Sequence, residues 1–181
     1  MKTFEISGNL KGEKGLGDNY RNFVSVIYMV RNYYVSHLGE SLMDSIGLYI
    51  DNAVNNAANN AMSNTGHTPI ITPILGKYLI IKLGITQKCS KAQIAFQFAH
   101  ELMHFVFFAK YGIDKKRVDE QEEAICTAAS LIVLHNLYTV VDFDRYNDHV
   151  QSLPNSHTHY RKGTEVAKGV DYNFKELIKK I

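Results

Sequence analysis

The residues best suited to catalysis or metal binding are two histidines and a glutamate in the pentapeptide His-Glu-Leu-Met-His at positions 100–104. Helix residues four apart project from one face, a turn apart, so His100 and His104 can direct both imidazoles at one ion. Zinc accepts such nitrogens at about 2.0–2.1 Å. Glu101 lies beside that face, where it can take a proton from a metal-bound water and pass it to a leaving amine. The pattern predicts a hydrolytic zinc centre.

The helix predicted around this motif, from Ser90 to about Tyr111, is apolar on almost every face. Its apolar positions around the motif are Ile94, Phe96, Phe98, Ala99, Leu102, Phe105, Val106, Phe107 and Phe108. Such a helix is normally packed inside a fold, where histidine and glutamate need partners because unpaired polar groups are costly to bury. A metal ion would supply these partners. The alternative is a pair of core histidines bonded to the backbone, with Glu101 at the surface.

A third ligand is needed, because catalytic zinc is commonly held by two histidines and one glutamate, with the fourth position left for water. Glu123 follows His104 by 19 residues and falls at the end of the first turn of the next predicted helix, which Asp119 opens. It directly precedes an inward-facing apolar run, so we expect it at the margin of the buried face. Glu120 is the fallback ligand. Glu120 and Glu122 are otherwise explained by the helix dipole, which favours carboxylates in a first turn.

The spacing of these residues is similar to that of a known family. Two stretches carry the resemblance: H-E-L-x-H at 100–104 and E-A-x-x-x-A-A-x-L-I at 123–132. They resemble the gluzincins, and within them the ImmA/IrrE-type metallopeptidases, over about residues 78–134. The resemblance implies a peptidase acting on a peptide or protein substrate. It also implies one zinc ion held by both histidines and Glu123, with Glu101 acting on the metal-bound water.

The chain departs from the family pattern at two places. Ile125 stands where an asparagine is common, and Val133-Leu134 stands where Met-Pro is common. An alternative is therefore a catalytically inactive, zincin-like binding or regulatory module, and another is a metal-free helical interaction domain. Three evident ligands, where a structural zinc usually has four, favour the catalytic interpretation.

Peptide hydrolysis also needs a group that stabilises the developing oxyanion. The candidates are His157, His159, Tyr160 and Arg161, whose loop can fold over the cleft. An ordinary exposed loop is the preferred interpretation of this stretch. We likewise interpret His135, in the apolar helix after Glu123, as a satisfied core histidine rather than a group that supports the metal ligands.

Composition and charge narrow the class of protein. The 181 residues, 45% of them hydrophobic, fit one compact domain over 1–181, with a motif core at about 78–138. The formal charge of +2 comes without a basic surface cluster, so we expect no nucleic-acid partner. No apolar run reaches the ~18 residues of a membrane span and no signal peptide is evident, so we expect no membrane association and a cytoplasmic location.

Two cysteines are too few for a disulfide framework, and Cys126 is expected to be a buried free thiol.

We expect an α+β fold, a mainly helical zincin-like domain with a small β-sheet or hairpin beside the active-site helix. Residues 1–18 are expected to hold a short edge strand. A hairpin is predicted over 69–83, with its first strand at a sheet edge because of Pro69 and Pro73. The remaining predictions are helices at 19–38, 41–63, 90–111 and 119–138, an irregular segment at 142–163, and a last short helix capped by Asn173.

Overall fold

The computed structural model describes residues 3–11, 15–52, 69–115, 118–154 and 157–181, and it has the predicted α+β, mainly helical fold. The strands are β1 (Phe4–Ile6), β2 (Gly47–Asn52), β3 (Ile70–Ile74) and β4 (Tyr78–Leu83). The helices are α1 (Tyr20–Leu38), α2 (Glu40–Met43), α3 (Lys91–Tyr111), α4 (Glu120–Leu137), α5 (Val140–Ser152), α6 (Thr158–Gly169) and α7 (Phe174–Ile178). Two short 3-10 turns, Gly8–Leu10 and Gly17–Asn19, precede α1. None of the helices in the described ranges combines the length and the apolar character needed to span a bilayer.

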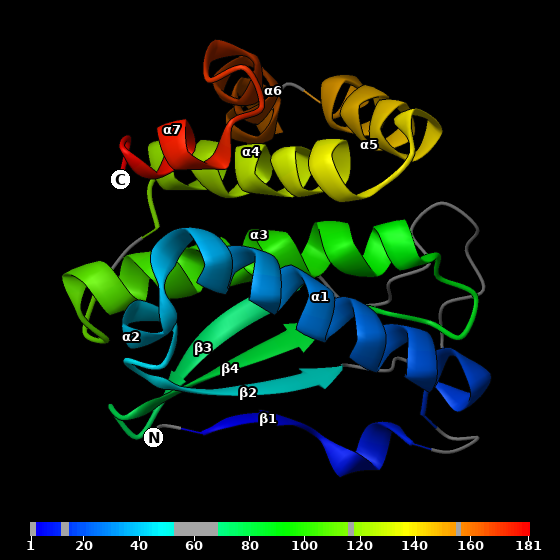
Figure 1. Cartoon of the computed structure of the whole chain (residues 1–181), viewed down its shortest axis with the longest axis vertical. Coiled ribbons are helices and arrows are strands. Elements are labelled where there is room, and N and C mark those ends of the chain that lie inside the picture. The colour runs from blue at the N-terminus through cyan, green and yellow to red at the C-terminus, as the bar shows by residue number, and fades with distance from the viewer. Residues whose placement is uncertain (1–2, 12–14, 53–68, 116–117, 155–156) are drawn as a thin grey trace.

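The elements stack in layers, with the sheet at one end of the molecule and α5, α6 and α7 at the other (Figure 1). The strand order is β1-β2-β4-β3; β1, β2 and β4 are parallel, and β3 runs antiparallel to β4. Helices α1 and α3 cover one face of the sheet, α4 lies on the far side of α3, and the three C-terminal helices cover α4. Because α3 is enclosed by protein on opposite sides, its sequence is apolar almost all round.

Helix α1 has the boundaries and the buried stripe that its sequence predicts. Its buried side chains are Phe23, Val26, Ile27, Val30 and Tyr34. Gly39 ends the helix with a φ of +82°, a backbone conformation that glycine adopts without strain. The Tyr34 hydroxyl donates a hydrogen bond of 2.7 Å to the Ala99 carbonyl oxygen, which ties α1 to α3 immediately before the motif.

The hairpin predicted at 69–83 is confirmed as β3 and β4. Leu75 and Gly76 form its turn with φ values of +53° and +63°, the left-handed pair that a tight hairpin turn requires. Strand β3 lies at an edge of the sheet, as Pro73 predicts, because proline has no N–H to give a second neighbouring strand. The short edge strand expected within 1–18 is β1, at the opposite edge.

The helix predicted at 41–63 is wrong over its described part. Only Ser41–Met43, the end of α2, are helical there, and β2 follows as an inner strand between β1 and β4. Leu48 and Ile50 point from β2 toward the helices and are almost fully buried. Pairing with both neighbouring strands fixes this segment, and such tertiary pairing leaves little trace in local periodicity. Residues 53–63 of the prediction lie outside the described residues.

The irregular segment predicted at 142–163 is also wrong, because α5 and the first half of α6 occupy it. Phe143, Tyr146 and Val150 recur at spacings of three and four residues on α5 and face inward. The Tyr146 ring stacks on Phe96 of α3 with the ring centroids 5.0 Å apart. Charged residues between these positions weaken the apolar period, so the helix is hard to recognise in the sequence alone.

A glycine lets α6 pack closely on α4. Gly163 is buried, and a Cβ atom at this position would lie 2.6 Å from the Thr127 Cβ and 2.9 Å from the Ala124 carbonyl oxygen. Non-bonded carbon atoms normally keep about 3.5–4.0 Å between them. Because Gly163 lies one turn after Tyr160, this contact also sets how closely the start of α6 approaches α3.

Gly163→Ala should lower the free energy of unfolding by about 1–3 kcal/mol, because α6 must move away from α4 to admit a methyl group. Thermal unfolding should show a fall of about 2–4 °C per kcal/mol for a chain of this size. Gly169→Ala is the matched control, since Gly169 ends the same helix and a Cβ there meets nothing within 4 Å. Equal melting temperatures for the two variants would contradict the close contact.

Candidate metal centre

Helix caps fix the two halves of the centre. At the start of α3, the Ser90 hydroxyl accepts a hydrogen bond of 3.1 Å from the Gln93 N–H. At the start of α4, the Asp119 carboxylate accepts one of 2.8 Å from the Glu122 N–H. Both caps are predicted from the sequence, and each satisfies a donor that a helix start leaves unpaired. The first turns of α4 then lie against the middle of α3, where the motif is.

The structure brings His100, His104 and Glu123 together. The Nε2 atom of His100 is 3.1 Å from Oε2 of Glu123, and the Nε2 atom of His104 is 3.6 Å from Oε1 of the same carboxylate. Zinc bonds of about 2.0–2.1 Å in a tetrahedral arrangement separate the ligand atoms by about 3.3–3.4 Å. The observed distances lie on either side of that value. The two oxygens of the Glu123 carboxylate thus approach one imidazole each.

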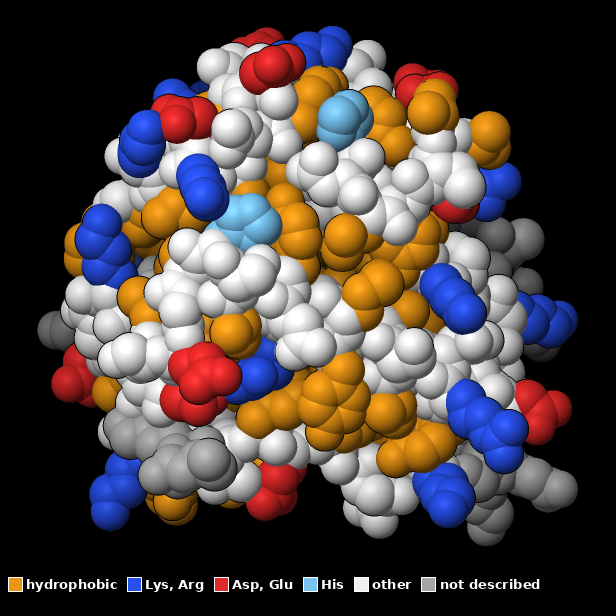
Figure 2. Space-filling view, viewed as in Figure 1, with side chains coloured by type: hydrophobic (Ala, Val, Ile, Leu, Met, Phe, Trp, Pro, Cys, Tyr) orange, Lys and Arg blue, Asp and Glu red, His pale blue; other side chains and the backbone are white. Residues whose placement is uncertain are grey.

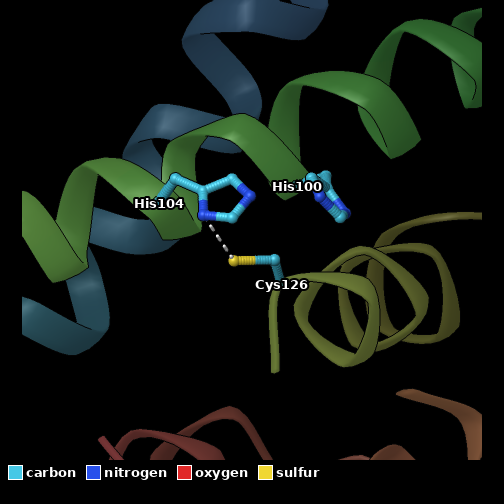
Figure 3. Close-up of side chains that lie close together, drawn as sticks. All are labelled: His100, His104 and Cys126. Atoms are coloured by element: carbon cyan, nitrogen blue, oxygen red, sulfur yellow. Dashed lines mark hydrogen bonds between the residues drawn. The ribbon is translucent and has the colours of Figure 1, made fainter. Parts of the chain in front are cut away.

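Cys126 is a further potential ligand that the sequence did not single out. The ligand atoms of His100, His104 and Cys126 all lie within 4.8 Å of one another, and this group could hold a metal ion (Figure 3). The Cys126 Sγ is 3.3 Å from Nδ1 of His104. The predicted buried free thiol is confirmed. The sequence gives one indication that Cys126 lies beside the histidines. Cys126 follows Glu123 by three residues, so both lie on the same face of one helix.

Without a bound metal, the surroundings favour ionisation of Glu123 and disfavour ionisation of Cys126. Complete burial, followed by the charges of three nearby carboxylates, raises the pKa of the Cys126 thiol well above its usual range. Metals bind the thiolate, which this environment disfavours. Burial also opposes ionisation of Glu123, but the hydrogen bond from His100 and the charges of nearby histidines outweigh it and lower the pKa of the Glu123 carboxyl.

Glu122 contacts the other side of the His104 ring. Its Oε1 is 2.8 Å from Nδ1 of His104, its Oε2 pairs with the Lys115 ammonium, and its side chain is only 2% exposed. Glu122 lies in the first turn of α4, as the helix-dipole interpretation requires, and its burial adds contacts that this interpretation does not predict. Glu120, the fallback ligand, lies on the surface instead and pairs with Lys162 at 3.2 Å.

Glu101 is buried between the histidines and the sheet. The backbone N–H of Ile71, in β3, donates a hydrogen bond to its carboxylate. Burial, supported by the Glu123 charge and opposed by the two histidines and this hydrogen bond, raises the pKa of the Glu101 carboxyl. A carboxylate with a raised pKa is a stronger proton acceptor near neutral pH. The alternative that places Glu101 at the surface is therefore wrong.

Tyr160, from the first turn of α6, also reaches the centre. Its ring centroid is 5.9 Å from that of His100. Burial, together with the charges of nearby carboxylates, raises the pKa of Tyr160 to about 12. The phenol therefore stays protonated near neutral pH and can donate a hydrogen bond. The preferred interpretation of this stretch as an exposed loop is wrong, since Tyr160 is helical and half-buried.

The other oxyanion candidates lie around Tyr160. The His159 ring is 4.2 Å from the Tyr160 ring, and its charge contributes to the lowered pKa of Glu123. His157 stacks on the same tyrosine at 5.8 Å but is exposed, whereas Arg161 is half-buried. Tyr160 is thus the candidate with a direct ring contact to a predicted ligand.

His135 is not the core histidine that the sequence predicts. Its side chain is exposed and stacks on Tyr172 with the ring centroids 4.3 Å apart. Phe143 of α5 meets both rings edge-on. The imidazole therefore belongs to an aromatic group that joins α4, α5 and the turn before α7.

Comparisons of the chain with protein-family models, with curated proteins and with solved structures find no match. The class of protein is therefore defined by the fold and the site: an α+β, mainly helical domain with a histidine-containing cluster that could hold a metal ion. The resemblance to gluzincins rests on the motif residues of the sequence alone.

Metal titration distinguishes the two candidate third ligands. Glu123→Gln should weaken Zn²⁺ binding by more than about 100-fold, beyond the loss typical of an outer-shell partner, because a neutral amide replaces a carboxylate ligand. Cys126→Ser should leave Zn²⁺ affinity almost unchanged. Competition with a chromophoric chelator measures both affinities. Substituted Co²⁺ should show no thiolate-to-metal charge-transfer band, and such a band, lost in Cys126→Ser, would instead identify the thiol as a ligand.

Proposed function

We propose that this protein is a zinc-dependent peptidase in which His100, His104 and Glu123 hold one zinc ion and Glu101 acts as the general base. The observation that carries the proposal is the approach of one carboxylate to both imidazoles, at 3.1 and 3.6 Å from their Nε2 atoms. Two nitrogens and one oxygen leave the fourth position of a tetrahedral ion available to solvent or substrate, as in catalytic zinc sites.

The charge of the buried cluster supports a divalent cation. Glu101, Glu122 and Glu123 contribute three carboxylates, and Lys115 contributes one ammonium. With neutral imidazoles, the cluster carries two negative charges when its carboxylates are ionised. Uncompensated charge is costly to bury, and the pairing available within the cluster is incomplete. One Zn²⁺ ion would bring the cluster to neutrality.

Glu101 is positioned for proton transfer. A zinc ion at this site would supply Lewis acidity, lowering the pKa of a bound water to about 7 and polarising a substrate carbonyl. Glu101 would accept the proton of the attacking water and deliver it to the leaving nitrogen, for which its raised pKa is suited. The Ile71 N–H orients the carboxylate, and the surrounding apolar side chains of α3 exclude bulk water.

Tyr160 is the best-placed donor for the developing oxyanion. Its contact with His100 holds it next to a predicted ligand, and its phenol remains protonated because its pKa is about 12. A fixed donor of this kind stabilises charge that develops only in the transition state. The close packing at Gly163 holds the helix that carries it.

Strand β3 supports a peptide or protein as the substrate. The Ile71 N–H that meets Glu101 points away from β4, and the Pro73 nitrogen, two residues on, faces the same way. Among the described strands, none pairs with that side of β3. The backbone carbonyl oxygens on this side of β3 could accept hydrogen bonds from an extended peptide near Glu101, whereas Pro73 offers no N–H and that of Ile71 is already bonded to Glu101.

Two substitutions separate metal binding from turnover. Glu101→Gln should keep stoichiometric zinc but lose hydrolysis, because the amide cannot accept the proton. His100→Ala should lose both zinc and hydrolysis. Metal analysis and a chelator-sensitive assay on a fluorogenic peptide library measure the two properties. Hydrolysis retained by Glu101→Gln would remove Glu101 from the mechanism, and zinc binding without hydrolysis by the unmodified protein would favour an inactive zincin-like binding module.

Tyr160→Phe should lower kcat by about 10²–10³-fold, the cost of removing one oxyanion donor, with little change in KM or Zn²⁺ affinity. Because Tyr160 titrates only at about 12, the residual activity should keep the pH profile of the unmodified enzyme through neutral and mildly alkaline pH. His157→Gln, at an exposed ring in the same stretch, is the control. An unchanged kcat in Tyr160→Phe would exclude this role.

A further inference from the structure

A chain of three side chains runs from the α3–α4 connection to the candidate metal centre. Lys115, in that connection, pairs with Oε2 of Glu122, and Oε1 of Glu122 lies 2.8 Å from Nδ1 of His104. The side-chain exposures are 16% for Lys115, 2% for Glu122 and 5% for His104. Both contacts are therefore largely shielded from water, and hydrogen bonds to charged groups are strongest in such surroundings.

The carboxylate of Glu122 selects one tautomer of His104. An ionised carboxylate only accepts hydrogen bonds, so Nδ1 of the neutral ring must carry the hydrogen. The lone pair is then on Nε2, the atom that lies 3.6 Å from Glu123. A ring fixed in this way presents its metal-binding nitrogen toward His100 and Glu123, and it cannot rotate without breaking the bond to Glu122.

Lys115 compensates the charge of the buried Glu122 carboxylate. A carboxylate this deeply buried needs a compensating charge, and the ammonium of Lys115 supplies it. The same ammonium lies 5.6 Å from the Phe107 ring centroid and 6.0 Å from that of Phe108, so the aromatic faces of α3 hold the lysine in place. The pair therefore fixes both the Glu122 carboxylate and the connection that carries Lys115.

We propose that Glu122 and Lys115 are positioning residues for His104, and that the α3–α4 connection controls metal affinity through them. This inference rests on the proposed metal site. Glu122 acts directly on the ring, whereas Lys115 acts only through Glu122. The sequence places Glu122 next to Glu123, so a single turn of α4 would supply one ligand to the metal and one hydrogen-bond acceptor to a second ligand.

The test is a double-mutant cycle on metal affinity, with Zn²⁺ as the probe and a chromophoric chelator as competitor. Glu122→Ala should weaken Zn²⁺ binding by about 10–100-fold, the range observed when an outer-shell partner of a ligand is removed. Lys115→Met should weaken it by a smaller factor. The double variant should match Glu122→Ala, because Lys115 has no effect once Glu122 is absent. Lys110→Met is the control, since the Lys110 ammonium lies over the Tyr111 ring, 5.5 Å from its centroid.

A second readout separates positioning from a general loss of structure. In the metal-free protein, at a pH alkaline enough to keep the His104 ring neutral, its ¹⁵N shifts should report the Nδ1–H tautomer, and Glu122→Ala should shift the ring toward a mixture. Glu122→Gln keeps an acceptor for Nδ1 and should retain the tautomer while losing the ion pair to Lys115. This variant answers the question if Glu122→Ala does not fold.

The outcomes distinguish this proposal from the proposed function. If the unmodified protein binds no Zn²⁺, both are overturned. If it binds Zn²⁺ but Glu122→Ala and Lys115→Met bind equally well, the positioning role is overturned and the metal site stands. Additive losses in the double variant would show that Lys115 acts independently of Glu122, which contradicts the proposed order.

Discussion

The middle of α3 has almost no side that faces water, and this constraint governs the rest of the structure. The sheet and α1 cover one side of the helix, and α4 covers the other (Figure 1). Every ionisable group on this part of α3 must therefore find a partner within the protein. His100 and His104 find them on α4, and Glu101 finds one in β3. The result is a concentration of carboxylates and imidazoles around the middle of α3.

Close approach of α6 completes the surroundings of this cluster. Gly163 permits the contact with α4, and the same helix carries Tyr160 to the ring of His100. On the face seen in Figure 2, hydrophobic side chains gather over the middle of the molecule and charged ones lie mostly toward its periphery. The half-buried phenol of Tyr160, the carboxylate of Glu123 and the two imidazoles thus come from α6, α4 and α3, and the close contact at Gly163 sets how α6 lies on α4.

Sequence reasoning succeeded where the information is local. The caps at Ser90 and Asp119, the stripe of α1 and the hairpin all follow from neighbouring residues, and so does the face shared by His100 and His104. It failed where partners lie far along the chain. Strand β2 depends on β1 and β4, and the burial of Glu122 depends on Lys115 and a histidine on another helix. Cys126 was recognised as a buried thiol, but its contact with His104 joins two helices and is not a local feature of the sequence.

All the groups that could hold the metal lie on one pair of helices that are consecutive in the chain, between positions 100 and 126. The sheet is different, because its parallel strands pair across longer stretches of chain. Strand β2 pairs with β4 across the segment between them, and β1 pairs with β2 across α1 and α2. Loop-closure entropy is smaller for the helical pair than for the parallel strands. Contact order therefore favours assembly of the histidine-carboxylate cluster before the sheet. An ion captured at that stage would stabilise a folding nucleus, coupling metal supply to the rate at which newly made chains mature.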